Sequence, residues 1–185
     1  MTYTSYTSYE HLEETFRHVC VQGLESLGKD DFPVFEQHVT DPLPDGNYGV
    51  VSLVAATNIG FSSNSRRLVN NNTQVEVTQY QAYSMMFSVE LLGDQSRDLI
   101  FQLQLWFNSN KGVTALNDEG IVFYDASNIR PLHQLIPSGR EYERRCQMDV
   151  NISCNFEVGN KVFEPVIEDF NLNFNFNGRT KNPRR

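Results

Sequence analysis

The chain has 185 residues, of which 39% are hydrophobic and 21% are charged, and its formal net charge is -8. This length and composition are typical of one globular domain with a sizeable core and exclude wholesale disorder. The acidic excess argues against a protein that grips nucleic-acid phosphates, because that grip requires clustered lysine and arginine.

The three cysteines, Cys20, Cys146 and Cys154, form no CxxC pair and no disulfide framework. On one extended strand, Cys146 and Cys154 would lie roughly 27 Å apart, too far for a disulfide. We therefore expect buried free thiols and a reducing compartment. The N-terminal MTYTSYTSYE does not match a secretory signal, and no apolar run is long enough to cross a bilayer. These features predict assembly in the cytoplasm without a membrane.

The first predicted element is an amphipathic helix from about Ser8 to Leu27. Its apolar residues repeat at helical spacing, and they are Leu12, Phe16, Val19, Cys20, Gly23, Leu24 and Leu27. Thr7 followed by Glu10 predicts a capping box at the start of the helix. Gly28 suits the position after the helix end, where φ turns positive.

Prolines and turn residues exclude a helix from residues 29–47. The β-branched run at 48–57 then predicts a central strand. Residues 62–74 are rich in serine and asparagine and contain Arg66 and Arg67. This stretch is either a long mobile loop or an extended hairpin arm.

Alternation of apolar and polar residues predicts a second strand at 81–92. Asp94 is a candidate cap for a second helix, which runs to about Asn108 and is closed by Lys111 and Gly112. A short strand at 121–126 and a proline-containing loop at 130–143 follow.

The stretch 144–158 alternates without exception and predicts a long strand with one buried face. The buried residues would be Cys146, Met148, Val150, Ile152, Cys154, Phe156 and Val158. The opposite face carries Arg145, Asp149 and Glu157 among amides. It is either plain solvent-exposed sheet or the lining of an oligomer surface.

Gly159 and Asn160 predict a two-residue hairpin turn, and Pro165 makes the returning segment 161–167 an edge strand. Beyond it, apolar residues alternate with asparagines, and these are Phe170, Leu172, Phe174 and Phe176. This segment either completes its own sheet or adds to the sheet edge of a neighbouring subunit. The tail after Asp169 is basic, and we expect it to be disordered until it is captured.

Together these elements predict an α+β fold. We expect an antiparallel or mixed sheet of about four strands with two helices packed on one face, long loops or arms and a C-terminal extension. The whole of 1–185 would be a single domain, with its core at about 9–167 and a C-terminal arm at 168–185.

Two groups of residues invite a chemical interpretation. His11, Glu14 and His18 share a helix face and could bind a metal, but the surrounding charges favour a solvated surface. A cysteine nucleophile would need His38 or His133 as its base, and nothing in the sequence positions either one.

The remaining acids, such as Asp30 and Asp31, are scattered and indicate solvent-facing loops. The sequence contains no phosphate-binding loop, GxGxxG, GxSxG or zinc-binding spacing. We therefore expect neither an enzyme nor a cofactor. The alternative functions are assembly and a non-enzymatic module that binds a small ligand or peptide.

Several short motifs carry a family resemblance between about Tyr9 and Ile167. They are the N-terminal helix, Phe32-Pro33-Val34, the strand entry DPLPDGNYGVVSL and the closing stretch EYERRCQMDVNISCNFEV. Their layout resembles the neck and tail terminator-like proteins of tailed bacteriophages. The N-terminal TYTSY segment and the FNLNFNFNGRTKNPRR tail fall outside it.

The resemblance implies a structural virion protein that forms a ring, hexameric or of another order, between the portal or connector and the tail. It implies a central channel for DNA, no cofactor and no turnover. Expected partners are other copies of the chain, portal, connector or collar proteins, and tail-tube or other tail proteins. Net negative charge around such a ring would keep passing DNA from adhering, without sequence-specific binding.

If the chain forms such a ring, we expect certain residues to contact neighbouring subunits or the channel. These candidates are Arg66, Arg67, Arg144, Arg145, Asp149, Phe170, Leu172, Phe174 and Phe176. For Arg66 and Arg67, a flexible surface loop is the alternative interpretation.

Overall fold

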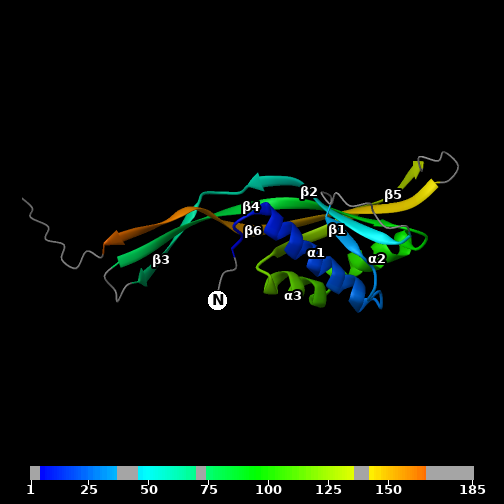
Figure 1. Ribbon diagram of the computed structural model, residues 1–185, viewed down its shortest axis with the longest axis horizontal. Helices are drawn as coiled ribbons and strands as arrows, with labels where there is room; N and C mark the ends of the chain where they lie inside the picture. The colour runs from blue at the N-terminus through cyan, green and yellow to red at the C-terminus, as the bar shows by residue number, and fades with distance from the viewer. Residues whose placement is uncertain (1–4, 37–45, 70–73, 136–141, 166–185) are drawn as a thin grey trace, which may run out of the picture.

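One long, curved sheet carries all the helices on one of its faces and extends well beyond them at one end (Figure 1). The computed structural model describes residues 5–36, 46–69, 74–135 and 142–165. Within these residues the helices are α1 (Tyr9–Ser26), α2 (Ser96–Phe107) and α3 (Asn110–Asp118). The strands are β1 (Val34–Glu36), β2 (Tyr48–Asn58), β3 (Ser63–Val69), β4 (Gln74–Leu92), β5 (Val122–Leu135) and β6 (Tyr142–Pro165).

The sheet has the order β1-β2-β4-β6-β5, and β3 also pairs with β4. β1 runs parallel to β2, whereas the pairs β2–β4, β3–β4, β4–β6 and β5–β6 are antiparallel. The predicted α+β class is therefore confirmed, with a mixed sheet and helices on one face. The described residues form six strands and three helices, more than the expected four and two.

The core lies between the helices and the alternate residues of the two central strands. Met148, Val150 and Ile152 of β6 are fully buried on the face that the strand pattern predicts. Phe16 of α1 stacks on Phe87 of β4 and on Phe107 of α2, with ring centroids 4.3 and 5.9 Å apart. The helices and the sheet thus meet in one aromatic cluster.

The ends of α1 differ slightly from the predicted ones. Ser8, not Thr7, is the N-cap, and its side chain accepts a hydrogen bond from the backbone N–H of His11 at 3.2 Å. At the other end, Leu27 is the C-cap and Gly28 has a φ of 75°, as the sequence predicts.

The second predicted helix corresponds to α2, which ends at Phe107, and it is followed by a third helix, α3, that was not predicted. Ser109 begins α3 by accepting a hydrogen bond from the N–H of Gly112, so Gly112 lies within a helix and does not end one. Asp94 is not the cap of α2, because Gln95 occupies that position without a side-chain hydrogen bond. The carboxylate of Asp94 instead lies 3.7 Å from the Arg144 guanidinium.

The serine- and asparagine-rich stretch forms an arm, the second of the two predicted alternatives. β3 pairs with residues 74–80 of β4, and β6 pairs with the other side of β4 up to Pro165. The predicted hairpin turn at 159–160 is wrong, because β6 continues through it. A register shift between Val77 and Gln79 accommodates the extra residues of β6. We call β3, residues 74–80 of β4 and residues 157–165 of β6 the arm.

The predicted loop at 130–143 is also wrong in part. β5 extends to Leu135 and β6 begins at Tyr142. Pro131 is tolerated in β5 because this strand is the last in the sheet and pairs only with β6 among the described strands. The predicted 168–185 extension, with Phe170, Leu172, Phe174 and Phe176, lies outside the described residues.

The segment before α1 is anchored by Tyr6. Its backbone forms a parallel bridge with Phe156, through hydrogen bonds of 2.9 Å to Asn155 and 3.0 Å from Glu157. Its hydroxyl donates to the carbonyl of Glu119 at 2.7 Å, and its side chain is 1% exposed. This segment continues the β6 edge just beyond Val122, where β5 begins, which the sequence did not predict.

Candidate functional site

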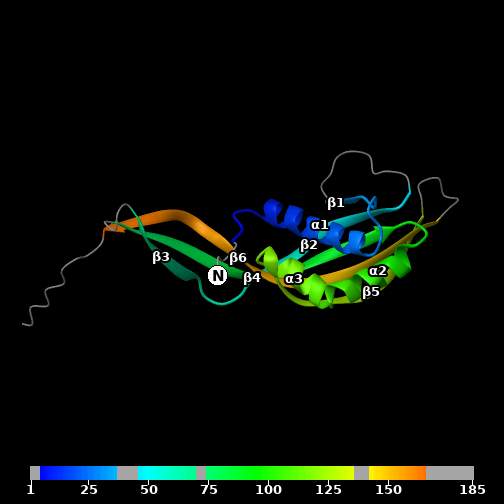
Figure 2. The same cartoon turned by 90° about the horizontal axis from the view of Figure 1, so that it is seen from below.

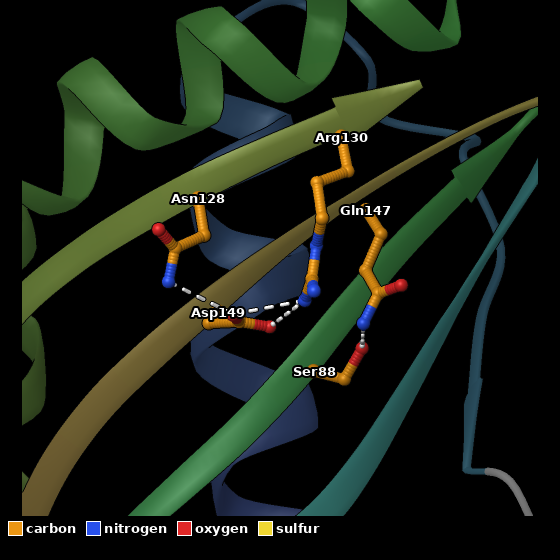
Figure 3. A network of polar contacts seen from close by, with 5 residues as sticks. All are labelled: Ser88, Asn128, Arg130, Gln147 and Asp149. Atoms are coloured by element: carbon orange, nitrogen blue, oxygen red, sulfur yellow. Dashed lines mark hydrogen bonds and ion pairs between the residues drawn. The ribbon is translucent and has the colours of Figure 1, made fainter. Parts of the chain in front are cut away.

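The helix-free face of the sheet carries a continuous row of paired polar side chains. We call the alternate β6 residues 145–153 and their side-chain partners on β4 and β5 the polar face. Part of it is drawn in Figure 3, where β5, β6 and β4 lie side by side. The row exists because these β6 residues alternate with the buried ones, so they all point away from the helices.

Asp149 lies at the centre of this row. The Arg130 guanidinium donates to both of its carboxylate oxygens, at 2.8 and 2.9 Å, and the Asn128 amide donates at 3.1 Å (Figure 3). Asp149 is 5% exposed although it faces away from the helices. A carboxylate this buried requires such partners, because an unpaired charge loses its hydration without compensation.

A bulge in β5 brings both partners to Asp149. The register shifts between Ser127 and Arg130, and Asn128 adopts a φ of 57°. Asparagine tolerates this left-handed conformation better than most residues. The irregular backbone therefore directs two side chains of β5 at one carboxylate of β6.

The other polar residues of β6 are paired in the same way. Arg145 forms an ion pair with Glu90, and Gln147 donates to the Ser88 hydroxyl at 2.8 Å. On the β5 side, the Asn151 amide donates to Asp125 at 2.8 Å. The Tyr124 hydroxyl donates to Ser153 at 3.1 Å. Every alternate β6 residue from 145 to 153 thus has a side-chain partner on a neighbouring strand.

This pairing matches both arginines of the polar face with a carboxylate, and Asp125, which accepts from the Asn151 amide, adds one further negative charge. Arg145 is matched by Glu90, and Arg130 is matched by Asp149. The donors and acceptors of these side chains bond to one another, so the polar face offers few unpaired cationic groups to a phosphate backbone. Chemically, the arrangement stabilises a rigid and hydrophilic surface, and it does not place an acid beside a base for proton transfer.

The structure places the predicted site residues in separate regions. Arg145 and Asp149 are part of the polar face, whereas Arg144 is two-thirds exposed beside Asp94. Arg66 and Arg67 are exposed on β3, opposite Val77 and Glu76 of β4. They lie in the arm, at the far end of the molecule from the start of β6 (Figures 1 and 2).

Sequence reasoning missed the partners of Asp149 and Arg145. Arg130 begins the stretch predicted to be a loop, Asn128 lies between that loop and the strand predicted at 121–126, and Glu90 was assigned only to the alternation of β4. Pairing across strands depends on the register, which a single strand pattern does not reveal. The asparagine at position 128, a residue type that tolerates a left-handed backbone, was the only local sequence signal of the bulge.

The alternative chemical sites find little support in the geometry. Cys20, Cys146 and Cys154 are buried free thiols. Burial raises the pKa of each one, to about 12 for Cys154, which disfavours the reactive thiolate. His38 lies outside the described residues, as does the side chain of His133.

The helix-surface histidines are no better arranged for metal binding. His18 lies 4.0 Å from Glu14, with both side chains about 60% exposed. His11 packs its ring edge against Tyr6. Among the residues that the structure describes, no group of three or more histidine, cysteine or acidic side chains could hold a metal.

Two surface depressions bear on the ligand-binding alternative. One, of about 560 Å³, lies between Ser5 and β3 and is lined mainly by serine and asparagine. Another, of about 740 Å³, lies at the start of α1 and is lined by Glu10, Glu13, Glu14 and other polar residues. Small-molecule sites are usually apolar clefts with a few convergent polar groups, which neither depression resembles.

A protein-family model for the phage neck terminator protein matches residues 10–180. The chain belongs to this family. The match extends over α1 and the entire sheet, and it includes residues beyond the predicted core boundary at 167. A search of curated proteins found no match.

Family membership confirms the resemblance seen in the sequence. The protein is a structural component of the phage neck, and it therefore belongs to the virion and interacts with other head or tail proteins. In the part of the chain that the structure describes, no helix has the length and apolar character needed to cross a bilayer.

Proposed function

We propose that this neck terminator protein forms a ring, hexameric in the simplest arrangement, that joins or terminates the tail at the head connector. The polar face lines a central channel through which DNA passes. The observation that carries this proposal is the polar face itself, an extended hydrophilic surface whose arginines are both paired internally with carboxylates.

Passing DNA requires a wall that does not retain it. Unpaired arginines on such a wall would bind phosphates and release counterions, which makes binding strong at moderate salt. On the polar face, Arg130 and Arg145 are neutralised by Asp149 and Glu90. The net charge of -8 per chain, repeated around a ring, adds a repulsive field that opposes adhesion.

The shape of the subunit also favours a ring over a monomer. The arm extends the sheet away from the helices (Figures 1 and 2), so none of the described helices packs over its strands. A sheet that projects in this way gains stability when it packs on another subunit. Arg66 and Arg67 lie in this projection, where they contact either a neighbouring subunit or the channel.

The proposed partners are other copies of the chain, portal, connector or collar proteins, and tail-tube or other tail proteins. DNA passes without sequence-specific contact, and assembly takes place in the host cytoplasm. The protein acts through its interfaces, so no residue has a catalytic role and no cofactor takes part.

The experiment is native mass spectrometry combined with particle imaging of the purified protein, alone and with its connector and tail subunits. We expect closed rings of one size with a central opening. A protein that stays monomeric at all concentrations and joins no ring with these partners would contradict the proposal.

The C-terminal segment offers a second test of assembly. If Phe170, Leu172, Phe174 and Phe176 dock on a neighbouring subunit, truncation after Ile167 impairs ring formation and leaves the monomer folded. Circular dichroism reports the fold and native mass spectrometry reports the ring. Unchanged assembly would reject a docking role for this segment.

A further inference from the structure

The exposed hydrophobic side chains of this protein gather at two opposite edges of the sheet. Ten large hydrophobic residues are exposed in the described part of the chain, and four of them lie between residues 54 and 69. Four others lie on α2 and at the start of β5. Single exposed apolar residues are ordinary, but clusters at an edge mark contact surfaces.

We call residues 54–69 the first edge. It comprises the second half of β2, the connection to β3, and β3 itself, and it exposes Val54, Ile59, Phe61 and Leu68. Phe61 is 100% exposed, which leaves a large aromatic ring without any packing partner in the monomer. Aromatic residues of this kind are the commonest anchors of protein interfaces.

The topology leaves the first edge uncovered. β6 occupies one side of β4 along its length, so β2 and β3 share the other side. β1 pairs with β2 only from Gly49 to Val51, before the first edge begins. No other described strand pairs with residues 54–69 on their outer side.

We call the exposed side chains of Phe101, Leu105, Val122 and Tyr124 the second edge, which adjoins the polar face at Tyr124, the partner of Ser153. β5 is the last strand on that side of the sheet, and its start carries Val122 and Tyr124, which are 51% and 55% exposed. α2 lies beside β5, because its Gln104 side chain donates to the carbonyl of Ala126 at 2.8 Å.

Phe101 and Leu105 extend this surface onto the helix. They are four residues apart on α2, so they lie on one helix face, and they are 53% and 56% exposed. Apolar side chains therefore flank the β5 edge from the helix layer and from the sheet.

The two edges carry opposite charge. Residues 54–69 contain Arg66 and Arg67 and no acidic residue. Residues 96–129, which carry the second edge, contain four acidic residues, Asp98, Asp118, Glu119 and Asp125, against two basic ones, Arg97 and Lys111, so this region is net acidic. Opposite charges around apolar centres steer two surfaces together and set their orientation.

We propose that the first edge of one copy docks on the second edge of the next copy. This inference rests on the proposed ring and names the two surfaces that close it. Because the surfaces differ and lie on opposite sides of the subunit, each copy uses both, which is the head-to-tail contact that a ring requires. The bulges in β5 interrupt its regular backbone spacing, so the contact is formed through side chains.

The test blocks one edge at a time. Phe61→Asp places a charge in the first edge, and Phe101→Asp places one in the second edge. Each variant alone is expected to be a monomer, because a ring needs both edges and the edge contact weakens roughly 30-fold or more. An equimolar mixture is expected to form a dimer with one copy of each variant and nothing larger, because only one productive pair of edges remains.

Three matched variants control this experiment. Phe61→Leu and Phe101→Leu keep an apolar group at each position and are expected to form the ring. Tyr9→Asp changes an exposed aromatic residue of α1 that packs on Tyr83 and Phe156 and belongs to neither edge. It is expected to assemble. Circular dichroism checks that every variant is folded.

Each result separates the inference from the proposed function. If the unmodified protein forms rings and either Asp variant still does, the edges are not the contact and only this inference fails. A dimer formed by one variant alone would indicate a symmetric contact and also overturn the inference. If the unmodified protein never assembles, with or without connector and tail subunits, the proposed ring itself fails.

Discussion

The two ends of this protein differ in what stabilises them. Where the helices cover the sheet, alternate side chains of β4 and β6 are fully buried, and Phe16, Phe87 and Phe107 join both layers. In the arm, β3 is exposed along almost its whole length, and its stability within the monomer comes from pairing with β4. The comparison suggests that one end is built to fold and the other to be completed by assembly.

The largest effect should follow from loss of the aromatic cluster. Phe16→Ala removes a fully buried ring that touches both the sheet and α2, and we expect it to lower the free energy of unfolding by about 3–5 kcal/mol. Urea denaturation followed by circular dichroism measures the change. A loss below about 1 kcal/mol would contradict the view that this cluster joins the two layers.

A smaller loss should follow from crowding the contact between α1 and α2. A Cβ atom at Gly23 would lie 2.7 Å from Leu103 Cδ1 and 2.8 Å from Trp106 Cε3. We expect Gly23→Ala to destabilise the protein by about 1–3 kcal/mol, although alanine favours helix. Gln22→Ala, one position earlier on an exposed site, is the control and should be neutral or slightly stabilising in the same urea titration.

Substitutions in the polar face, which lies at the helix-covered end, should lower the free energy of unfolding less. Asp149→Asn keeps the size of the side chain and removes the charge that faces Arg130, so we expect a loss of about 1–2 kcal/mol. Thermal unfolding of Asp149→Asn, of Arg130→Gln and of the double variant measures their coupling. Additive losses would show that the pair contributes no stability of its own.

Alkaline pH should destabilise the helix-covered end. The pKa of Cys154 is raised by burial from 9.0 to about 12, so the folded state favours the neutral thiol. This stability is complete below pH 9 and is lost as the pH rises from 9 toward 12. Between pH 8 and 10, we expect Cys154→Val to lose about 1 kcal/mol less stability than the unmodified protein. If paired urea titrations show that Cys154→Val and the unmodified protein lose equal stability over this pH range, the raised pKa of Cys154 is refuted.

The arm should tolerate substitution best. Arg66 and Arg67 are exposed, so we expect Arg66→Ala combined with Arg67→Ala to change the free energy of unfolding by less than about 0.5 kcal/mol. The same variant should still weaken assembly, because these are the charges of the first edge. Hydrogen exchange should show faster exchange in the arm than in the centre of β4 and β6 when the protein is monomeric, and slower exchange in the ring.

Alternation along 144–158 was enough to assign the buried face of β6 as far as Phe156, because the side chains of a strand alternate whatever its neighbours are. The prediction was wrong for Val158, which is 41% exposed because it lies in the arm, beyond the helices. The spacing of the first helix and the position of Gly28 were equally direct. The α3 helix, by contrast, depended on the cap formed by Ser109, and a glycine interpreted as a helix end proved to be inside it.

Local sequence thus determined the α+β class, the core faces and the family to which the chain belongs. The tertiary structure alone decided which side chains meet across strands, because register brings together residues that are distant in the chain. Asp149 meets Arg130 through a bulge, and β6 passes through Gly159 and Asn160 without turning. It also decided which hydrophobic residues stay uncovered, since exposure depends on strand order, and that order places Phe61 and Phe101 at opposite edges.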